Sequence, residues 1–92
     1  MAQHWTFLTN HGRVLLTIAD DPDVRLRDIA QIVGITERAA QLIVADLESA
    51  GYLVKQRQGR RNHYLVNASK NFRHPHEASH QVRELLAIFG EG

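Results

Sequence analysis

The sequence predicts a small α+β domain that is mainly helical and carries one antiparallel β-hairpin. Apolar residues recur at intervals of three and four over residues 27–50, which is the periodicity of amphipathic helices. After Gly51 the pattern changes, because residues 52–57 and 63–66 are rich in the β-branched and aromatic side chains typical of strands. Residues 58–62 between them contain the glycine that a hairpin loop favours. A chain of 92 residues is the length of one domain.

The first helix is expected to follow Asn10, a residue type that is favoured at helix N-caps. Its apolar stripe consists of Val14, Leu15, Ile18 and Ala19. Pro22 ends this helix, because proline cannot continue the helical hydrogen-bond pattern. A very short extended piece is expected at Val24–Leu26.

Two further helices are predicted at residues 27–33 and 36–50, with a short turn between them. Gly34 is suited to the left-handed conformation in which helices often end, and Thr36 is a good N-cap for the second helix. One face of the helix at residues 27–33 carries Ile29, Ile32 and Val33. The buried face of the helix at residues 36–50 is expected to consist of Ala40, Ile43, Val44 and Leu47.

A final helix is predicted over residues 75–90, because Pro75 suits a first helical turn and apolar residues recur after it at helical spacing. Aromatic side chains near the N-terminus are costly to expose in so small a domain, and they are expected to pack on the core or on a partner chain. The predicted homodimer interface therefore consists of Trp5, Phe7, Val82, Leu85, Leu86 and Phe89.

Composition narrows the classes of function. The absence of cysteine excludes disulfides and thiolate metal sites, and no apolar run approaches the ~18–20 residues that cross a bilayer. The N-terminus has no basic segment followed by an apolar one, so we expect no secretory leader and a cytoplasmic location. No serine lies in a glycine elbow and no glycine loop could cradle phosphate, so we expect neither catalysis nor a cofactor.

Positive charge is concentrated after the predicted helix at residues 36–50. Six Lys or Arg side chains lie between Lys55 and Arg73, and no Asp or Glu lies among them. A block of one sign in a nearly neutral chain favours contact with a polyanion, whereas a solvated surface usually mixes signs.

The segment LRDIAQIVGITERAAQLIVADLESAGYL, followed by KQRQGRRNHYLV, resembles the winged helix-turn-helix transcriptional regulators of the MarR and ArsR type. The resemblance covers residues 11–67, and the core of the predicted domain spans residues 10–67. It implies a homodimeric regulator that binds double-stranded DNA in a sequence-specific manner. The sequence does not tell whether the regulator responds to a small-molecule effector. Residues 36–50 would enter the major groove, and a basic wing at residues 55–64 would lie on the backbone or in the minor groove.

The expected DNA contacts of the helix are Thr36, Glu37, Arg38, Gln41 and Leu42, and those of the wing are Arg57, Arg60, Arg61 and His63. Two of these depart from the family pattern, in which a basic or small residue is common at Glu37 and a polar one at Leu42. Leu42 could contact a thymine methyl group or pack on the domain's own surface. Arg25 and Arg27 are further candidates for phosphate contact.

Two alternatives remain open at this level. The scaffold can serve as a protein-interaction module that does not bind DNA, and the acidic N-terminal half of the chain favours that reading. The second alternative is a metal-responsive regulator. His76 and His80 would share a helix face with Glu77 nearby, and two imidazoles and a carboxylate can bind zinc. No metal is nevertheless expected, since other elements of such sensor sites are missing.

Overall fold

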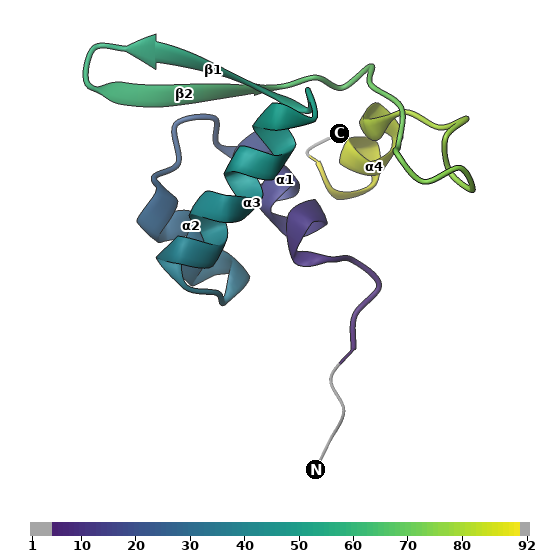
Figure 1. The fold of residues 1–92 in the computed structure, drawn as a ribbon, viewed down its shortest axis with the longest axis horizontal. Coiled ribbons are helices and arrows are strands. Elements are labelled where there is room, and N and C mark those ends of the chain that lie inside the picture. Colours follow the sequence, from purple (N-terminus) through teal and green to yellow (C-terminus); the bar gives the residue numbers. More distant parts are fainter. Residues whose placement is uncertain (1–4, 91–92) are drawn as a thin grey trace.

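The computed structural model describes residues 5–90; Met1–His4, on which the expectation about a leader partly rests, and Glu91–Gly92 lie outside the described residues. The elements follow in the order α1 (Asn10–Asp20), α2 (Leu26–Val33), α3 (Glu37–Ser49), β1 (Leu53–Gln58), β2 (Arg61–Val66) and α4 (Val82–Phe89) (Figure 1). This order of helices followed by one antiparallel hairpin and a last helix confirms the predicted α+β winged helix fold.

The start of α1 differs by one residue from the prediction. Thr9 is the N-cap, because its hydroxyl oxygen accepts a hydrogen bond from the Gly12 N–H at 3.1 Å, and Asn10 is the first helical residue. The extended piece expected at Val24–Leu26 does not form a strand, since Leu26 already begins α2. This segment nevertheless lies beside the hairpin, because the Tyr64 N–H donates to the Pro22 carbonyl at 3.0 Å.

The turn between α2 and α3 forms as predicted. Gly34 has a φ of +85°, which an L side chain rarely adopts, and its N–H donates to the Ala30 carbonyl. Thr36 then caps α3, with its hydroxyl oxygen accepting from the Ala39 N–H at 3.0 Å. The two helices are therefore joined by a short turn of fixed geometry.

The core lies between α1, α2 and α3 and is completed by β1 and α4. The buried side chains of these elements include Val14, Leu15, Ile18, Ile29, Ala30, Ala40, Ile43, Val44, Leu47, Leu53 and Val82. The predicted buried face of α3 is confirmed in full. On α2, Ile29 and Ala30 are buried, whereas Ile32, which was expected to share a face with Ile29, is 66% exposed.

Strands β1 and β2 form a two-stranded antiparallel hairpin, called the wing below, that extends away from the helices (Figure 1). The wing is longer than predicted, because the pairing continues to Gln58 and Arg61 and leaves a two-residue turn. Gly59 in this turn has a φ of +64°, as the first central residue of a tight hairpin turn requires. Lys55 pairs with Tyr64 and Arg57 with Asn62, which places these side chains on one face of the wing.

The last helix begins at Val82 rather than at Pro75. Residues 74–79 form turns, and a bridge between Asn71 and Gln81 brings the chain back before α4 starts. A capping box between Gln81 and Glu84 then fixes the start of the helix. Proline at a first-turn position was therefore a misleading signal here, since the local hydrogen bonds define a later start.

Within residues 5–90, none of the helices has both the length and the apolar character needed to cross a membrane.

Candidate nucleic-acid interface

The face of α3 that points away from the core carries most of the side chains expected to contact DNA. Glu37, Arg38 and Gln41 are exposed, and Leu42 is 57% exposed. They point outward because Ala40, Ile43, Val44 and Leu47 face the core, which leaves the intervening positions on the opposite side of the helix. Thr36 caps the helix with its oxygen, so its O–H proton remains free to donate to a phosphate.

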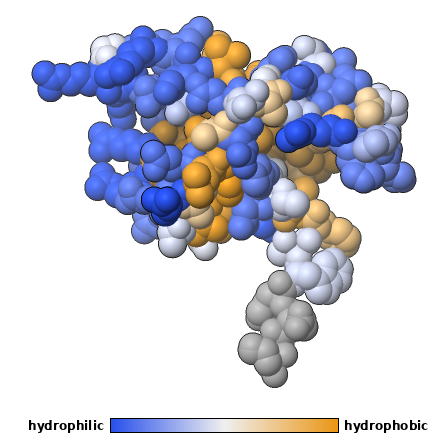
Figure 2. All heavy atoms as spheres, viewed as in Figure 1, coloured by the Kyte–Doolittle hydropathy of each residue, from blue (hydrophilic) through white to orange (hydrophobic). Residues whose placement is uncertain are grey.

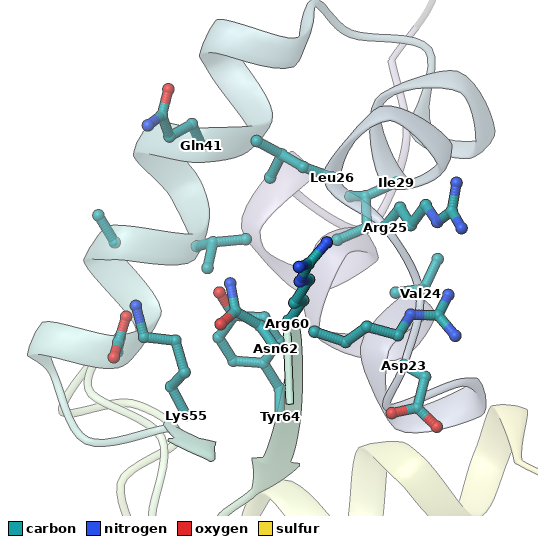
Figure 3. A pocket seen from close by; sticks show the side chains of 14 residues that line it. Asp23, Val24, Arg25, Leu26, Ile29, Gln41, Lys55, Arg60, Asn62 and Tyr64 are labelled. Carbon is teal, nitrogen blue, oxygen red and sulfur yellow. The ribbon is translucent and has the colours of Figure 1, made fainter. Parts of the chain in front are cut away.

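A groove of about 610 Å³ separates α3 from the wing and from the segment before α2. Its walls include Arg25, Gln41, Lys55, Arg60, Arg61 and Tyr64. Figure 3 shows Gln41 and Lys55 on one side, Arg25 and Asp23 on the other, and Arg60, Asn62 and Tyr64 between them. The groove thus brings a cation before α2 close to cations of the wing, although they are far apart in the sequence.

Among residues 5–90, the arginines of the wing have no carboxylate partner. Every ion pair between the described residues involves a histidine, so Arg57, Arg60 and Arg61 form none with a carboxylate in residues 5–90. All three side chains are exposed. Figure 2 shows the outer part of the wing as hydrophilic, with apolar residues nearer the helices, and another apolar patch lies below, near the middle of the view where α3 runs. Free guanidinium groups on an exposed hairpin are suited to contact with phosphate.

His63 has a partner inside the domain. Its Nδ1 lies 2.7 Å from Oδ1 of Asp23, and only a fifth of its side chain is exposed. This contact joins β2 to the loop before α2, next to the hydrogen bond from the Tyr64 N–H to the Pro22 carbonyl. His63, which the sequence predicts as a DNA contact, thus also makes an anchoring contact within the domain.

The floor of the groove includes the half-buried ring of Tyr64. Burial raises the pKa of this phenol above its ordinary value of 10, and the nearby carboxylate of Glu48 raises it further. The hydroxyl is therefore protonated at neutral pH and available as a hydrogen-bond donor. Glu48 itself is one of the two acidic side chains, with Asp23, that line the groove.

These features form the arrangement that the sequence pattern predicted: a capped helix after a tight turn, its polar face outward, and a basic hairpin beside it. The chain also matches the family described as winged helix-turn-helix DNA-binding over residues 8–54, just over half of its length. The chain belongs to the winged helix-turn-helix DNA-binding family. The match spans α1, α2 and α3 and the start of β1, which are the elements that carry the exposed face of α3. Double-stranded DNA is therefore the partner of this domain.

A comparison with characterised proteins found no relative that matches the chain. The family thus establishes the winged helix-turn-helix domain, and the MarR or ArsR subtype rests on the resemblance of the sequence alone.

The residues expected at a dimer interface divide into two groups. Val82 is wrong as an interface residue, because it is 1% exposed and belongs to the domain's own core, against which Leu86 also packs. Trp5 and Phe7 are exposed and form an edge-to-face pair with ring centroids 5.2 Å apart. Phe89 remains exposed as well.

The histidines after the wing do not share a helix face as the sequence suggested, because residues 74–79 form turns. The side chain of His76 bonds to Glu77 at 2.9 Å and that of His80 to Glu84 at 2.7 Å. Among residues 5–90, no group of three His, Asp or Glu side chains is arranged to hold a metal ion.

Sequence reasoning missed the role of Asp23 and the exposure of Ile32 and Ile88. No local signal could reveal the first, since Asp23 and His63 are 40 positions apart. Ile88 lies six positions after the buried Val82, which places it on a different face of α4.

Proposed function

We propose that this winged helix-turn-helix domain is a sequence-specific transcriptional regulator that inserts α3 into the major groove of DNA. The observation that supports it is the shared groove, in which Gln41 of α3 and the wing residues Arg60 and Arg61 line the same cavity. A helix and a basic hairpin on one side of the domain can contact base edges and flanking backbone at the same time.

The proposal divides the contacts between two elements. Arg38 and Gln41 would contact base edges, because arginine pairs with guanine and glutamine with adenine in the major groove. Thr36 would bind phosphate, and Glu37 can accept a hydrogen bond from cytosine. The wing arginines would contact phosphates or a narrow minor groove, with Arg25 on the adjacent backbone.

We further propose that the regulator acts as a homodimer. The exposed side chains of Trp5, Phe7 and Phe89 support this, because aromatic groups that small domains leave in solvent commonly form interfaces. Leu85 is half-buried and borders an apolar cavity with Phe7. A two-fold dimer would bind a nearly palindromic site with half-sites ~34–36 Å apart or a multiple of that spacing.

The test is fluorescence anisotropy at two salt concentrations. It uses two kinds of labelled duplex DNA: duplexes of mixed sequence, and duplexes selected for binding to the protein. We expect salt-sensitive binding to mixed DNA and tighter binding to selected sites. Arg60→Ala combined with Arg61→Ala should weaken both classes of DNA alike, whereas Arg38→Ala should change the ranking of selected sites. Uniform weakening by both variants would contradict the division of contacts.

A protein-interaction module is the competing function, and one observation favours it: Ile32 and Leu42 are exposed on the two central helices, and Glu37 lies near them in sequence. Absence of salt-sensitive DNA binding even at low salt would select this function over the regulator.

A further inference from the structure

Leu42 is exposed on the part of α3 that the proposed function places against bases. The side chain is 57% exposed, and it is absent from the partly buried apolar residues that pack on the core. Leu42 is therefore largely open to solvent in the free domain, which favours contact with a partner over packing on the domain's own surface. The leucine lies one turn after Arg38 and directly after Gln41, so it shares their side of the helix.

Leu42 has two alanines among its neighbours on this face, and its charged neighbours are Arg38 and Asp46, one turn before and one turn after it. Ala39 is half-buried, and Ala45, one turn further along, is exposed and lines the groove beside the wing. Position 42 itself therefore carries a hydrocarbon side chain, with the polar side chains of Arg38 and Gln41 next to it. A base pair facing this position meets a hydrocarbon surface, which can form no hydrogen bond.

The major groove offers one apolar group among its base edges, the C5 methyl of thymine. We propose that Leu42 binds a thymine methyl group and thereby determines the preference of this domain for thymine at one position in each half-site. The inference rests on the proposed function, because it requires α3 to lie in the major groove. It adds a specificity that comes from burial of apolar surface, without a hydrogen bond.

The geometry of α3 also places this thymine relative to the base that Arg38 contacts. Four residues advance an α-helix by ~6 Å, and base pairs follow one another at ~3.4 Å. The thymine should therefore lie within about two base-pair steps of the base contacted by Arg38. This spacing is a second outcome that the experiment can check.

The experiment begins with a DNA site selected by the wild-type protein and replaces each thymine in turn by deoxyuridine, which lacks only the C5 methyl. Anisotropy titrations then compare the wild type with Leu42→Ala. The wild type should lose about fourfold in affinity at one thymine per half-site, the contribution of one buried methyl group. Leu42→Ala should bind thymine and uracil duplexes equally at that position.

Ile32→Ala is the matched control, because Ile32 is an aliphatic side chain of α2 that is 66% exposed. It should keep the wild-type response to uracil. Equal thermal unfolding of the two variants and the wild type would show that both remain folded. If Leu42→Ala responds to the uracil exchange as the wild type and Ile32→Ala do, Leu42 makes no contact with a thymine methyl group and the inference is wrong.

The inference and the proposed function can fail separately. Sequence-selective DNA binding in which no thymine-to-uracil exchange depends on Leu42 overturns the inference and leaves the regulator intact. Selected sites without a thymine near the Arg38 contact would have the same consequence. If the wild-type protein shows no salt-sensitive DNA binding, both fail together.

Discussion

Nδ1 of His63 in β2 lies 2.7 Å from Oδ1 of Asp23, and this contact joins the wing to the loop that precedes α2. A two-stranded hairpin is only marginally stable by itself, so its position beside α3 depends on contacts of this kind. The backbone bond from Tyr64 to Pro22 is the second such contact. Together they hold the basic side chains of the wing at a defined distance from α3.

We therefore predict that His63→Phe loosens the wing. The ring replaces the imidazole in bulk but forms no hydrogen bond, and loss of a bond worth ~1 kcal/mol should speed amide exchange in β1 and β2 about fivefold. Hydrogen exchange of the free protein measures this without interference from DNA contacts. His11→Phe is the control, since it breaks a comparable pair with Asp46 that joins α1 to α3. Unchanged exchange in the wing of His63→Phe would show that the pair is not an anchor.

The salt dependence of DNA binding should reveal how many phosphate groups the protein contacts. If the three wing arginines and Arg25 each contact a phosphate in both protomers of a dimer, the plot of log K against log salt should have a slope of about −7. The double variant Arg60→Ala with Arg61→Ala removes half of these contacts, and the slope should become shallower, about −4. Arg83→Gln, an exposed charge on α4, should leave the slope unchanged. An unaltered slope in the double variant would place the wing away from the backbone.

The turn between α2 and α3 should depend on the backbone freedom of Gly34. A Cβ added there would meet no atom within 4 Å, so the cost of Gly34→Ala comes from the φ of +85° alone. We expect a loss of ~1–2 kcal/mol in the free energy of unfolding. Gly12→Ala is the contrasting variant, because Gly12 is in α1 with ordinary contacts and should gain ~0.5–1 kcal/mol. Chemical denaturation measures both; a neutral Gly34→Ala would refute the strain.

The helical core could be predicted from the sequence because its signals are local and periodic. The buried face of α3, the cap at Thr36 and the left-handed Gly34 all follow from spacing and residue type within one or two turns. Ile32 shows the limit of such signals. In a helix of eight residues, several faces satisfy the apolar pattern, and packing against α1 and α3 decides which of them is buried.

The parts of the site that could not be predicted depend on contacts between distant segments. The residues that carry charge or recognition were identifiable by type, but the pairing of His63 with Asp23 and the groove shared by Arg25 and Arg60 arise only when the wing folds against the loop before α2. The late start of α4 has the same origin, since the bridge between Asn71 and Gln81 competes with a helix beginning at Pro75.

Acid should weaken the start of α4. The Gln81 N–H, and then the hydrogen bond from His80, hold the pKa of Glu84 below its ordinary value. Because the folded pKa is the lower one, the stabilisation is present above the ordinary value of 4.5 and is lost as the pH falls further. The melting temperature of Glu84→Gln should consequently fall less than that of the wild type between pH 6 and pH 3.

Tyr64→Phe provides the opposite control at alkaline pH. Burial raises the pKa of this phenol, so the folded state resists its ionisation and loses stability as the pH rises above 10. The variant should lose less stability in that range and behave like the wild type in acid. If Glu84→Gln and the wild type melt in parallel throughout the acid range, the contacts of Glu84 do not stabilise the helix.

Substitutions on the two sides of α4 should have different effects, one on the stability of the fold and the other on self-association. Val82 is 1% exposed, so Val82→Ala should reduce the free energy of unfolding by ~1–3 kcal/mol. Phe89→Ser removes a side chain that is 57% exposed, and it should change the unfolding free energy by less than ~0.5 kcal/mol while weakening a dimer. Denaturation and analytical ultracentrifugation measure the two effects. A sedimentation profile of Phe89→Ser identical to that of the wild type would remove α4 from the proposed interface.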